Sequence, residues 1–286
     1  MRSSRLSWRQ TPLVAVLLLV AAACSNSADS AAGSTAPAAG TSEGAVPDGE
    51  MPMQPGAADM KIQITSPASG FVLQDNELTV EVQTSGFDST CDLAGKPIQE
   101  GTGHWHVLLD GALIDMACGT SYTMSMQNVG AGAHMLEVLP AQNDHAEIHD
   151  NAVEIPFTYE PSNPLPEVTA SSVTGDPAIE ILEPADGATL SGDFTVKVAF
   201  TNFTSSCELL GKPDVPGYGH WHINIDSMTG PMMGMGTMLG MACTQTFKGS
   251  TDGLDAGSTH TLFALLTGNG HAPLDVFDSI DYTVSG

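Results

Sequence analysis

Short runs of alternating hydrophobic and polar residues recur along the chain and predict β-strands rather than helices. Residues 77–85 (ELTVEVQTS) and 193–202 (DFTVKVAFTN) are examples, and Gly, Asn or Pro separates such runs. No segment shows a helical period of useful length. About seven short strands per 100 residues, with a tryptophan on a central strand, predict an all-β immunoglobulin-like sandwich.

The strand pattern occurs twice, in the same order. IQITSPASGFVL at 62–73 matches IEILEPADGATL at 179–190, and a Cys-[Asp/Glu]-Leu-x-Gly-Lys-Pro motif follows in both copies. Such internal similarity indicates a tandem duplication. The predicted organisation is therefore two immunoglobulin-like domains, 60–160 and 178–286, joined by a linker at 161–177.

The N-terminal residues predict export. Three arginines precede an apolar run and a stretch of small residues, which is typical of a signal peptide over residues 1–23. The pattern resembles that of bacterial lipoproteins, which implies lipidation at Cys24; cleavage to a soluble secreted protein is the alternative. Residues 24–59, rich in Ala, Ser, Gly and Pro, predict a disordered tether. We expect an anchored lipoprotein of the bacterial cell envelope that faces outside the cytoplasm.

The net charge of the chain argues against some classes of binding partner. After residue 23 the chain contains five lysines, no arginine and 33 acidic residues, a formal charge of −28. Such a chain repels nucleic acid and anionic membrane surfaces, so the lipid is its only expected membrane contact. It attracts cations, although most of these carboxylates serve solubility.

The tetrapeptide GHWH occurs at 103–106 and again at 219–222. Strand alternation places Trp221 on the hydrophobic face and turns His220 and His222 to the opposite face. The first copy follows the same pattern, so the tryptophans are structural and the histidines need another explanation.

Eight of the nine histidines occupy matching positions in the two copies. Imidazole ligands suit Cu(II) or Zn(II), so the repeated histidines predict one metal site in each domain. In the alternative interpretation they bond to the backbone or form a polar sheet face. The predicted ligands are His104, His106, His134, His145, His220, His222, His260 and His271.

A methionine-rich stretch, SMTGPMMGMGTMLGMAC, spans residues 227–243 of the second copy. It lacks a strand or helix period, and thioethers are soft ligands that select Cu(I). The stretch resembles methionine-rich loops of bacterial copper-handling proteins. A hydrophobic loop that packs over the sheet or contacts a protein partner is the alternative. The further predicted ligands are Met228, Met232, Met233, Met235 and Met238.

The four remaining cysteines predict one disulfide per domain. Cys91 pairs with Cys118 and Cys207 with Cys243, as expected in an oxidising compartment. These bonds would stiffen the GHWH strands. They also argue against a blue-copper centre, which needs a free thiolate.

The repeated unit resembles a group of uncharacterised bacterial exported domains whose strand begins Gly-His-[His/Trp]-His and which carry an Asn-x-His loop. That resemblance implies a fold and no activity. Copper–zinc superoxide dismutase is also similar in its His-x-His strand and disulfide, but this chain lacks the bridging-histidine loop and any arginine after the leader. No other catalytic motif occurs, so we expect no enzyme activity.

Two functions are compatible with these features. The first is a lipoprotein that binds copper, or alternatively zinc, for sequestration, delivery or tolerance. The second is a structural or adhesive tandem of immunoglobulin-like domains without a metal role.

Overall fold

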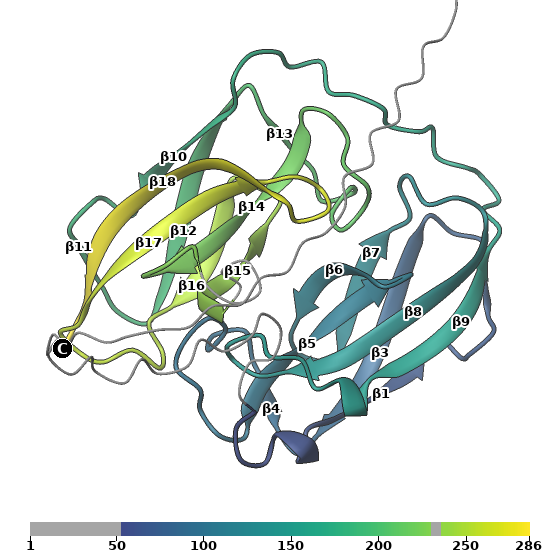
Figure 1. Cartoon of the computed structure of the whole chain (residues 1–286), viewed down its shortest axis with the longest axis horizontal. Coiled ribbons are helices and arrows are strands. Elements are labelled where there is room, and N and C mark those ends of the chain that lie inside the picture. Colours follow the sequence, from purple (N-terminus) through teal and green to yellow (C-terminus); the bar gives the residue numbers. More distant parts are fainter. Residues whose placement is uncertain (1–52, 230–235) are drawn as a thin grey trace, which may run out of the picture. The chain divides into compact units, whose positions relative to one another are not determined.

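A computed structural model describes residues 53–229 and 236–286 (Figure 1). The predicted signal peptide, Cys24 and three predicted ligands, Met232, Met233 and Met235, lie outside the described residues. The described part is almost entirely β, with two short 3-10 helices, η1 (Ala57–Asp59) and η2 (His149–Asn151). No helix in these ranges is long and apolar enough to cross a bilayer.

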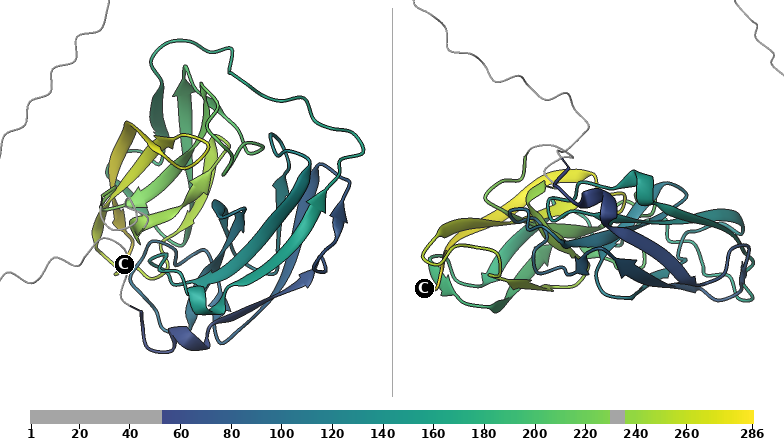
Figure 2. Two further views of the ribbon diagram at one scale, coloured as in Figure 1. Left: turned by 45° about the vertical axis from the view of Figure 1, so that its right-hand side comes forward. Right: turned by 90° about the horizontal axis from the view of Figure 1, so that it is seen from below.

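The first domain is a sandwich of two sheets, as predicted. One sheet has the order β1 (Lys61–Ser66), β3 (Glu77–Ser85), β7 (Ser121–Ser125). The second has the order β2 (Val72–Leu73), β9 (Val153–Tyr159), β8 (Gly132–Ala141), β5 (Thr102–Leu109), β4 (Asp88–Ser89), and β6 (Ala112–Ala117) also pairs with β5. The neighbouring strands β8 and β9 can be followed in Figures 1 and 2.

The second domain repeats this topology strand for strand. Its smaller sheet has the order β10 (Ala178–Glu183), β12 (Asp193–Thr201), β16 (Thr246–Ser250). Its larger sheet has the order β11 (Ala188–Leu190), β18 (Pro273–Val284), β17 (Thr259–Thr267), β14 (Tyr218–Ile225), β13 (Thr204–Ser205), and β15 (Met238–Ala242) pairs with β14. Both GHWH segments therefore lie on a strand that has neighbours on both sides.

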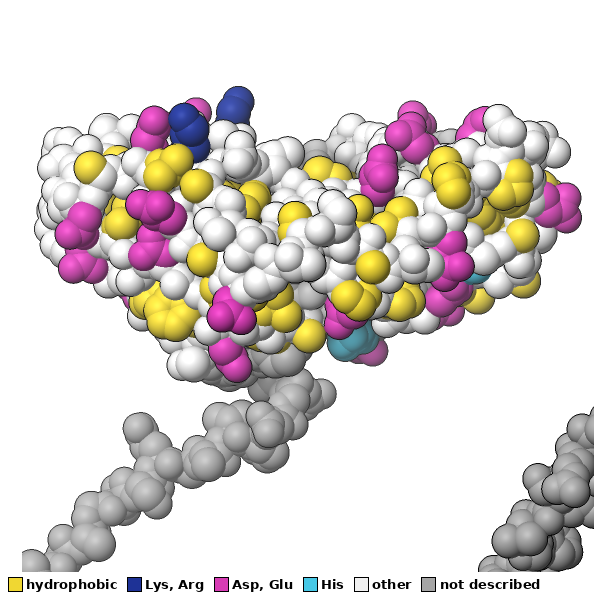
Figure 3. Space-filling model, turned by 90° about the horizontal axis from the view of Figure 1, so that it is seen from above, with side chains coloured by type: hydrophobic (Ala, Val, Ile, Leu, Met, Phe, Trp, Pro, Cys, Tyr) yellow, Lys and Arg dark blue, Asp and Glu magenta, His cyan; other side chains and the backbone are white. Residues whose placement is uncertain are grey.

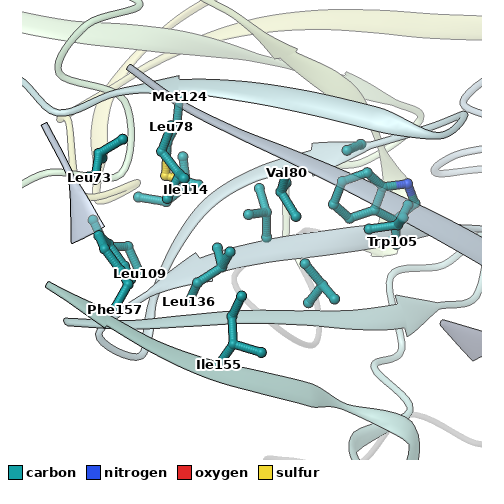
Figure 4. Packing of buried hydrophobic residues seen from close by; sticks show 14 of the residues in the cluster. Leu73, Leu78, Val80, Trp105, Leu109, Ile114, Met124, Leu136, Ile155 and Phe157 are labelled. Carbon is teal, nitrogen blue, oxygen red and sulfur yellow. The ribbon is translucent and has the colours of Figure 1, made fainter. Parts of the chain in front are cut away.

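Alternating apolar residues from the two sheets fill the core of each sandwich. In the first domain Leu78 and Val80 of β3 belong to the same buried cluster as Trp105 of β5, and Figure 4 shows their side chains directed between the layers. The indole of Trp105 is fully buried and donates its N–H to the carbonyl of Gly119. Trp221 does the same toward Thr244 in the second domain. The predicted inward orientation of both tryptophans is confirmed.

Both predicted disulfides, Cys91–Cys118 and Cys207–Cys243, are present. Each joins the segment before a GHWH strand to the end of the strand paired with it. Disulfide bonds fit an exported protein.

Residues just before the predicted boundary at residue 60 pack on the first domain. Ala57 and Met60 are buried against Ile148, and the backbone N–H of Gln54 donates to the side chain of Gln142. The last residues of the predicted tether thus pack on the sandwich. Residues 161–177 form no strand, and the side chain of Asn128 donates to the carbonyl of Val168 and accepts from its backbone N–H.

Acidic side chains are dispersed among apolar ones on the face drawn in Figure 3. They do not gather into a single patch on that face, which agrees with a role in solubility.

Replacing the buried indole tests the core assignment. Trp221→Ala should lower the free energy of unfolding by roughly 3–5 kcal/mol, because it removes a fully buried side chain and leaves a cavity. Phe277→Ala is the control: Phe277 is 51% exposed, so its loss should change stability by no more than about 0.5 kcal/mol. Urea denaturation measures both, and equal effects of the two substitutions would contradict the assignment.

Candidate metal centre

Three histidine side chains converge in the first domain. The Nε2 atom of His104 lies 3.1 Å from Nε2 of His106 and 3.0 Å from Nδ1 of His145, and the last two atoms are 3.4 Å apart. All three side chains are fully buried. Three ring nitrogens within this distance of one another could hold a metal ion.

The second domain contains the same triad with nearly identical geometry. Nε2 of His220 lies 3.0 Å from both Nε2 of His222 and Nδ1 of His271, which are themselves 3.4 Å apart. His220 is fully buried and His222 nearly so, whereas His271 is partly buried. Two copies that have diverged in sequence therefore retain the same arrangement of nitrogens.

The strand and the following loop place the three rings. His104 and His106 are two residues apart on β5, so both leave the sheet face opposite Trp105. His145 lies in the loop after β8 with φ of +65°, and His271 has φ of +68°. Positive φ is uncommon for a residue with a side chain and is found at functional positions more often than elsewhere. In both domains this backbone conformation accompanies a ring directed at the triad.

One histidine of each triad donates a hydrogen bond from its outer ring nitrogen to the other domain. Nε2 of His145 donates to the carbonyl of Met238 in the second domain, at 2.7 Å. Reciprocally, Nε2 of His271 donates to the carbonyl of Leu113 in the first domain, at 3.0 Å. The histidine faces are therefore not exposed sheet surfaces, because the edge strands β6 and β15 lie against each other there.

A carboxylate supports the first triad alone. Nδ1 of His106 donates to Oε1 of Glu147 at 2.7 Å, an arrangement that orients a ring whose other nitrogen faces a metal. The matching position two residues after His271 is Pro273. The two sites thus share their inner geometry and differ in this outer contact.

Burial favours the neutral form of these rings. Desolvation is the largest cause lowering the pKa of His145 and of His222 to about 3, and the neighbouring imidazoles lower both further. The pKa values of His104, His220 and His271 are lowered for the same leading reason. A neutral imidazole is the form that binds metal.

His134 and His260 lie outside the triads, which corrects the prediction that they join the other histidines. His134 opens β8, and Ala141, the residue opposite His104, lies seven residues further along that strand. At 3.3 Å per residue this is roughly 23 Å. Nδ1 of His134 bonds to the carboxylate of Asp110, and Nδ1 of His260 bonds to that of Asp226. Each of these rings therefore stabilises the turn that contains its aspartate.

Of the predicted methionine ligands, Met228 and Met238 fall within the described residues. Met238 is fully buried and contributes its backbone carbonyl to His145, while Met228 is half-buried in the preceding loop. The side chain of Met238 packs with Met116 and Met241. No described contact places either predicted methionine in a triad.

The predicted ligands do not include Met116, Met241 or Glu147, although Met241 belongs to the methionine-rich stretch. The two methionines belong to a repeated Met-Ala-Cys motif, and the register pairs Met116 with His106 and Met241 with His222. The repetition of this motif in both copies is the sequence feature that could have identified the two methionines. Glu147 has no equivalent in the second copy, so comparing the copies could not identify it.

Comparisons with known proteins add little about function. No family model matches the chain, and no curated protein matches it. Among solved structures, the fibronectin(III)-like modules of Clostridium thermocellum CbhA are 10% identical, with a TM-score of 0.25 over 78% of this chain and 94% of that one. A putative membrane anchored protein from Corynebacterium diphtheriae is 9% identical, with a TM-score of 0.25 over 80% of this chain and 59% of that one. Similarity at this level carries no argument about activity or ligands.

The lowered pKa values predict an acid-dependent loss of stability in the metal-free protein. Between about pH 6.5 and pH 3 the unfolded chain protonates these rings and the folded chain does not, so unfolding becomes easier as the pH falls. Each ring that titrates only in the unfolded chain contributes up to about 1.4 kcal/mol per pH unit.

The control is the double variant His145→Asn and His271→Asn, since Asn tolerates positive φ and does not titrate. Urea denaturation from pH 7 to pH 5 should show a shallower decline for this variant than for the wild type. Parallel curves would contradict the assignment, because carboxylate titration is common to both proteins.

Proposed function

We propose that the protein is an exported, lipid-anchored metal-binding protein that holds one transition-metal ion in each histidine triad. Copper is the proposed ion, zinc the alternative, and sequestration or delivery the proposed role. The proposal concerns binding rather than catalysis, since rings buried this deeply favour retaining an ion over admitting a substrate.

The observation that carries the proposal is the direction of the ring hydrogens in the first triad. A carbonyl and a carboxylate only accept hydrogen bonds, so neutral His145 must carry its hydrogen on Nε2 and neutral His106 on Nδ1. Their inner nitrogens are then bare lone pairs, 3.4 Å apart. A single hydrogen from His104 could satisfy one of them well and not both, whereas a cation at the centre would satisfy all three nitrogens.

The spacing of the nitrogens suits such a cation. Tetrahedral coordination with bonds of about 2.0–2.1 Å separates the ligand nitrogens by about 3.3 Å. The observed separations are 3.0–3.4 Å in both triads. Three protein ligands leave one position open, which suits an ion that has to be accepted and released.

Copper is favoured over zinc by the sulfur atoms around the triads. Met116 and Met241 occupy the strand positions opposite a triad histidine, and Met238 packs with both. Thioether sulfur favours Cu(I), and unlike a thiol it persists as a ligand in an oxidising compartment. The nearness of these methionines to the triad histidines supports copper as the bound ion. It does not make the methionines ligands of the triads.

Metal stoichiometry tests the proposal. The mature chain should bind two equivalents of Zn, measured by elemental analysis after desalting. His104→Ala with His106→Ala should reduce this to one, and adding His220→Ala and His222→Ala should reduce it to none. The double variant His134→Ala and His260→Ala is the control and should still bind two, because these rings bond to aspartates instead.

Undiminished uptake by the fourfold variant, or no uptake by the wild type, would contradict the proposal. Either result would favour the structural or adhesive alternative. Circular dichroism of each variant establishes that the strands are retained.

A further inference from the structure

A pocket of about 140 Å³ lies beside the two triads and is lined by both domains. Met116 lines it from β6 and Met241 from β15. These two residues are equivalent in the duplication, and they are in the same apolar cluster with Met238 and Ala94. The pocket therefore contains two thioethers, one contributed by each domain.

Strand register places each of these methionines next to a triad. Met116 is directly opposite His106 in the β5–β6 ladder, and Met241 is directly opposite His222 in the β14–β15 ladder. Directly opposed residues share a sheet face, with Cβ atoms about 4.5–5.5 Å apart. Ala117, the next residue, packs in the core with Trp105, which confirms that Met116 is on the histidine face.

The triads themselves do not line this pocket. His104, His106 and His145 have no exposed surface, so an ion has to pass other side chains before it reaches their nitrogens. Met116 and Met241 are the pocket residues whose strand partners are ligands of the two triads. Their long, unbranched side chains can change rotamer at low cost.

We propose that Met116 and Met241 form a thioether site for a soft monovalent cation, Cu(I), and that this site loads the two triads. This inference rests on the function proposed above. It adds that copper enters as Cu(I) and that Met116 and Met241 select it.

Two charged groups of the pocket, Asp115 and Lys96, already bond to other parts of the protein. Both oxygens of Asp115 are engaged, one by the backbone N–H of Met116 and one by the hydroxyl of Tyr122. The Lys96 ammonium donates to the carbonyls of Asp92, Ser250 and Asp252 and stays fixed at the wall. Asp92 also lines the pocket, at an exposed position, so the assignment to Cu(I) rests on the two thioethers, which are soft ligands.

The test uses the mature chain with Cys24→Ser, so that no free thiol competes for the cation. Zinc is added first and its uptake measured, and Ag(I) then serves as a redox-inert soft probe. With methyl-¹³C methionine, we expect one equivalent of Ag(I) to shift the methyl signals of Met116 and Met241 together. Met116→Leu should abolish the shift of Met241, whereas Met135→Leu, at a partly exposed position on β8, should not.

A kinetic measurement complements the titration. The double variant Met116→Leu and Met241→Leu should load Cu(I) into the triads at least tenfold more slowly than the wild type, with unchanged zinc stoichiometry and unchanged zinc affinity. Leucine nearly conserves the volume of methionine, so the fold should be retained.

Two outcomes would overturn this inference alone: normal zinc uptake with Ag(I) shifts confined to other methionines, or normal zinc uptake with an unchanged Cu(I) loading rate in the double variant. Failure of the wild type to take up zinc or copper would instead contradict the proposed function.

Discussion

Leaving a buried imidazole N–H without an acceptor costs free energy, and His145 and His271 avoid this cost through the contact between the two domains. Each triad directs one outer N–H across the domain boundary, from His145 to Met238 and from His271 to Leu113. Because a carbonyl oxygen only accepts hydrogen bonds, these acceptors fix which nitrogen carries the hydrogen. The contact between domains is thereby part of each candidate metal centre, and separating the domains would remove both acceptors.

The repeated Gly-Lys-Pro motif is explained by this contact rather than by ligand binding. Gly95 has φ of +69°, and a Cβ atom there would approach the backbone of Met238 to 2.5 Å. Gly211 has the same φ and would meet the backbone of Leu113 at 2.5 Å. Only glycine permits both the turn and the close approach. Each of these glycines therefore lies against the residue whose carbonyl accepts the hydrogen bond from the triad.

The two domains have the same arrangement of triad imidazoles, but the residues that surround the triads differ. Glu147 orients His106, while the second copy has Pro273 at the corresponding position. Lys96 reaches two carbonyls of the second domain, whereas the ammonium of Lys212 is buried without a hydrogen-bond partner among the described residues. A carboxylate behind a ligand raises its basicity. The two sites are thus expected to differ in affinity although their inner geometry is the same.

The sequence by itself determined the features that depend on neighbouring residues: the strands, the inward tryptophans, the shared face of His104 and His106, and the disulfides. Period-two alternation and the exported context are sufficient for these. Tertiary structure alone decided that His145 joins the triad and His134 does not, because alternation gives the face of a residue but not its position along a neighbouring strand. It alone also decided that the histidine faces are buried. That burial depends on contacts between residues far apart in the chain, which no local pattern of hydrophobic and polar residues encodes.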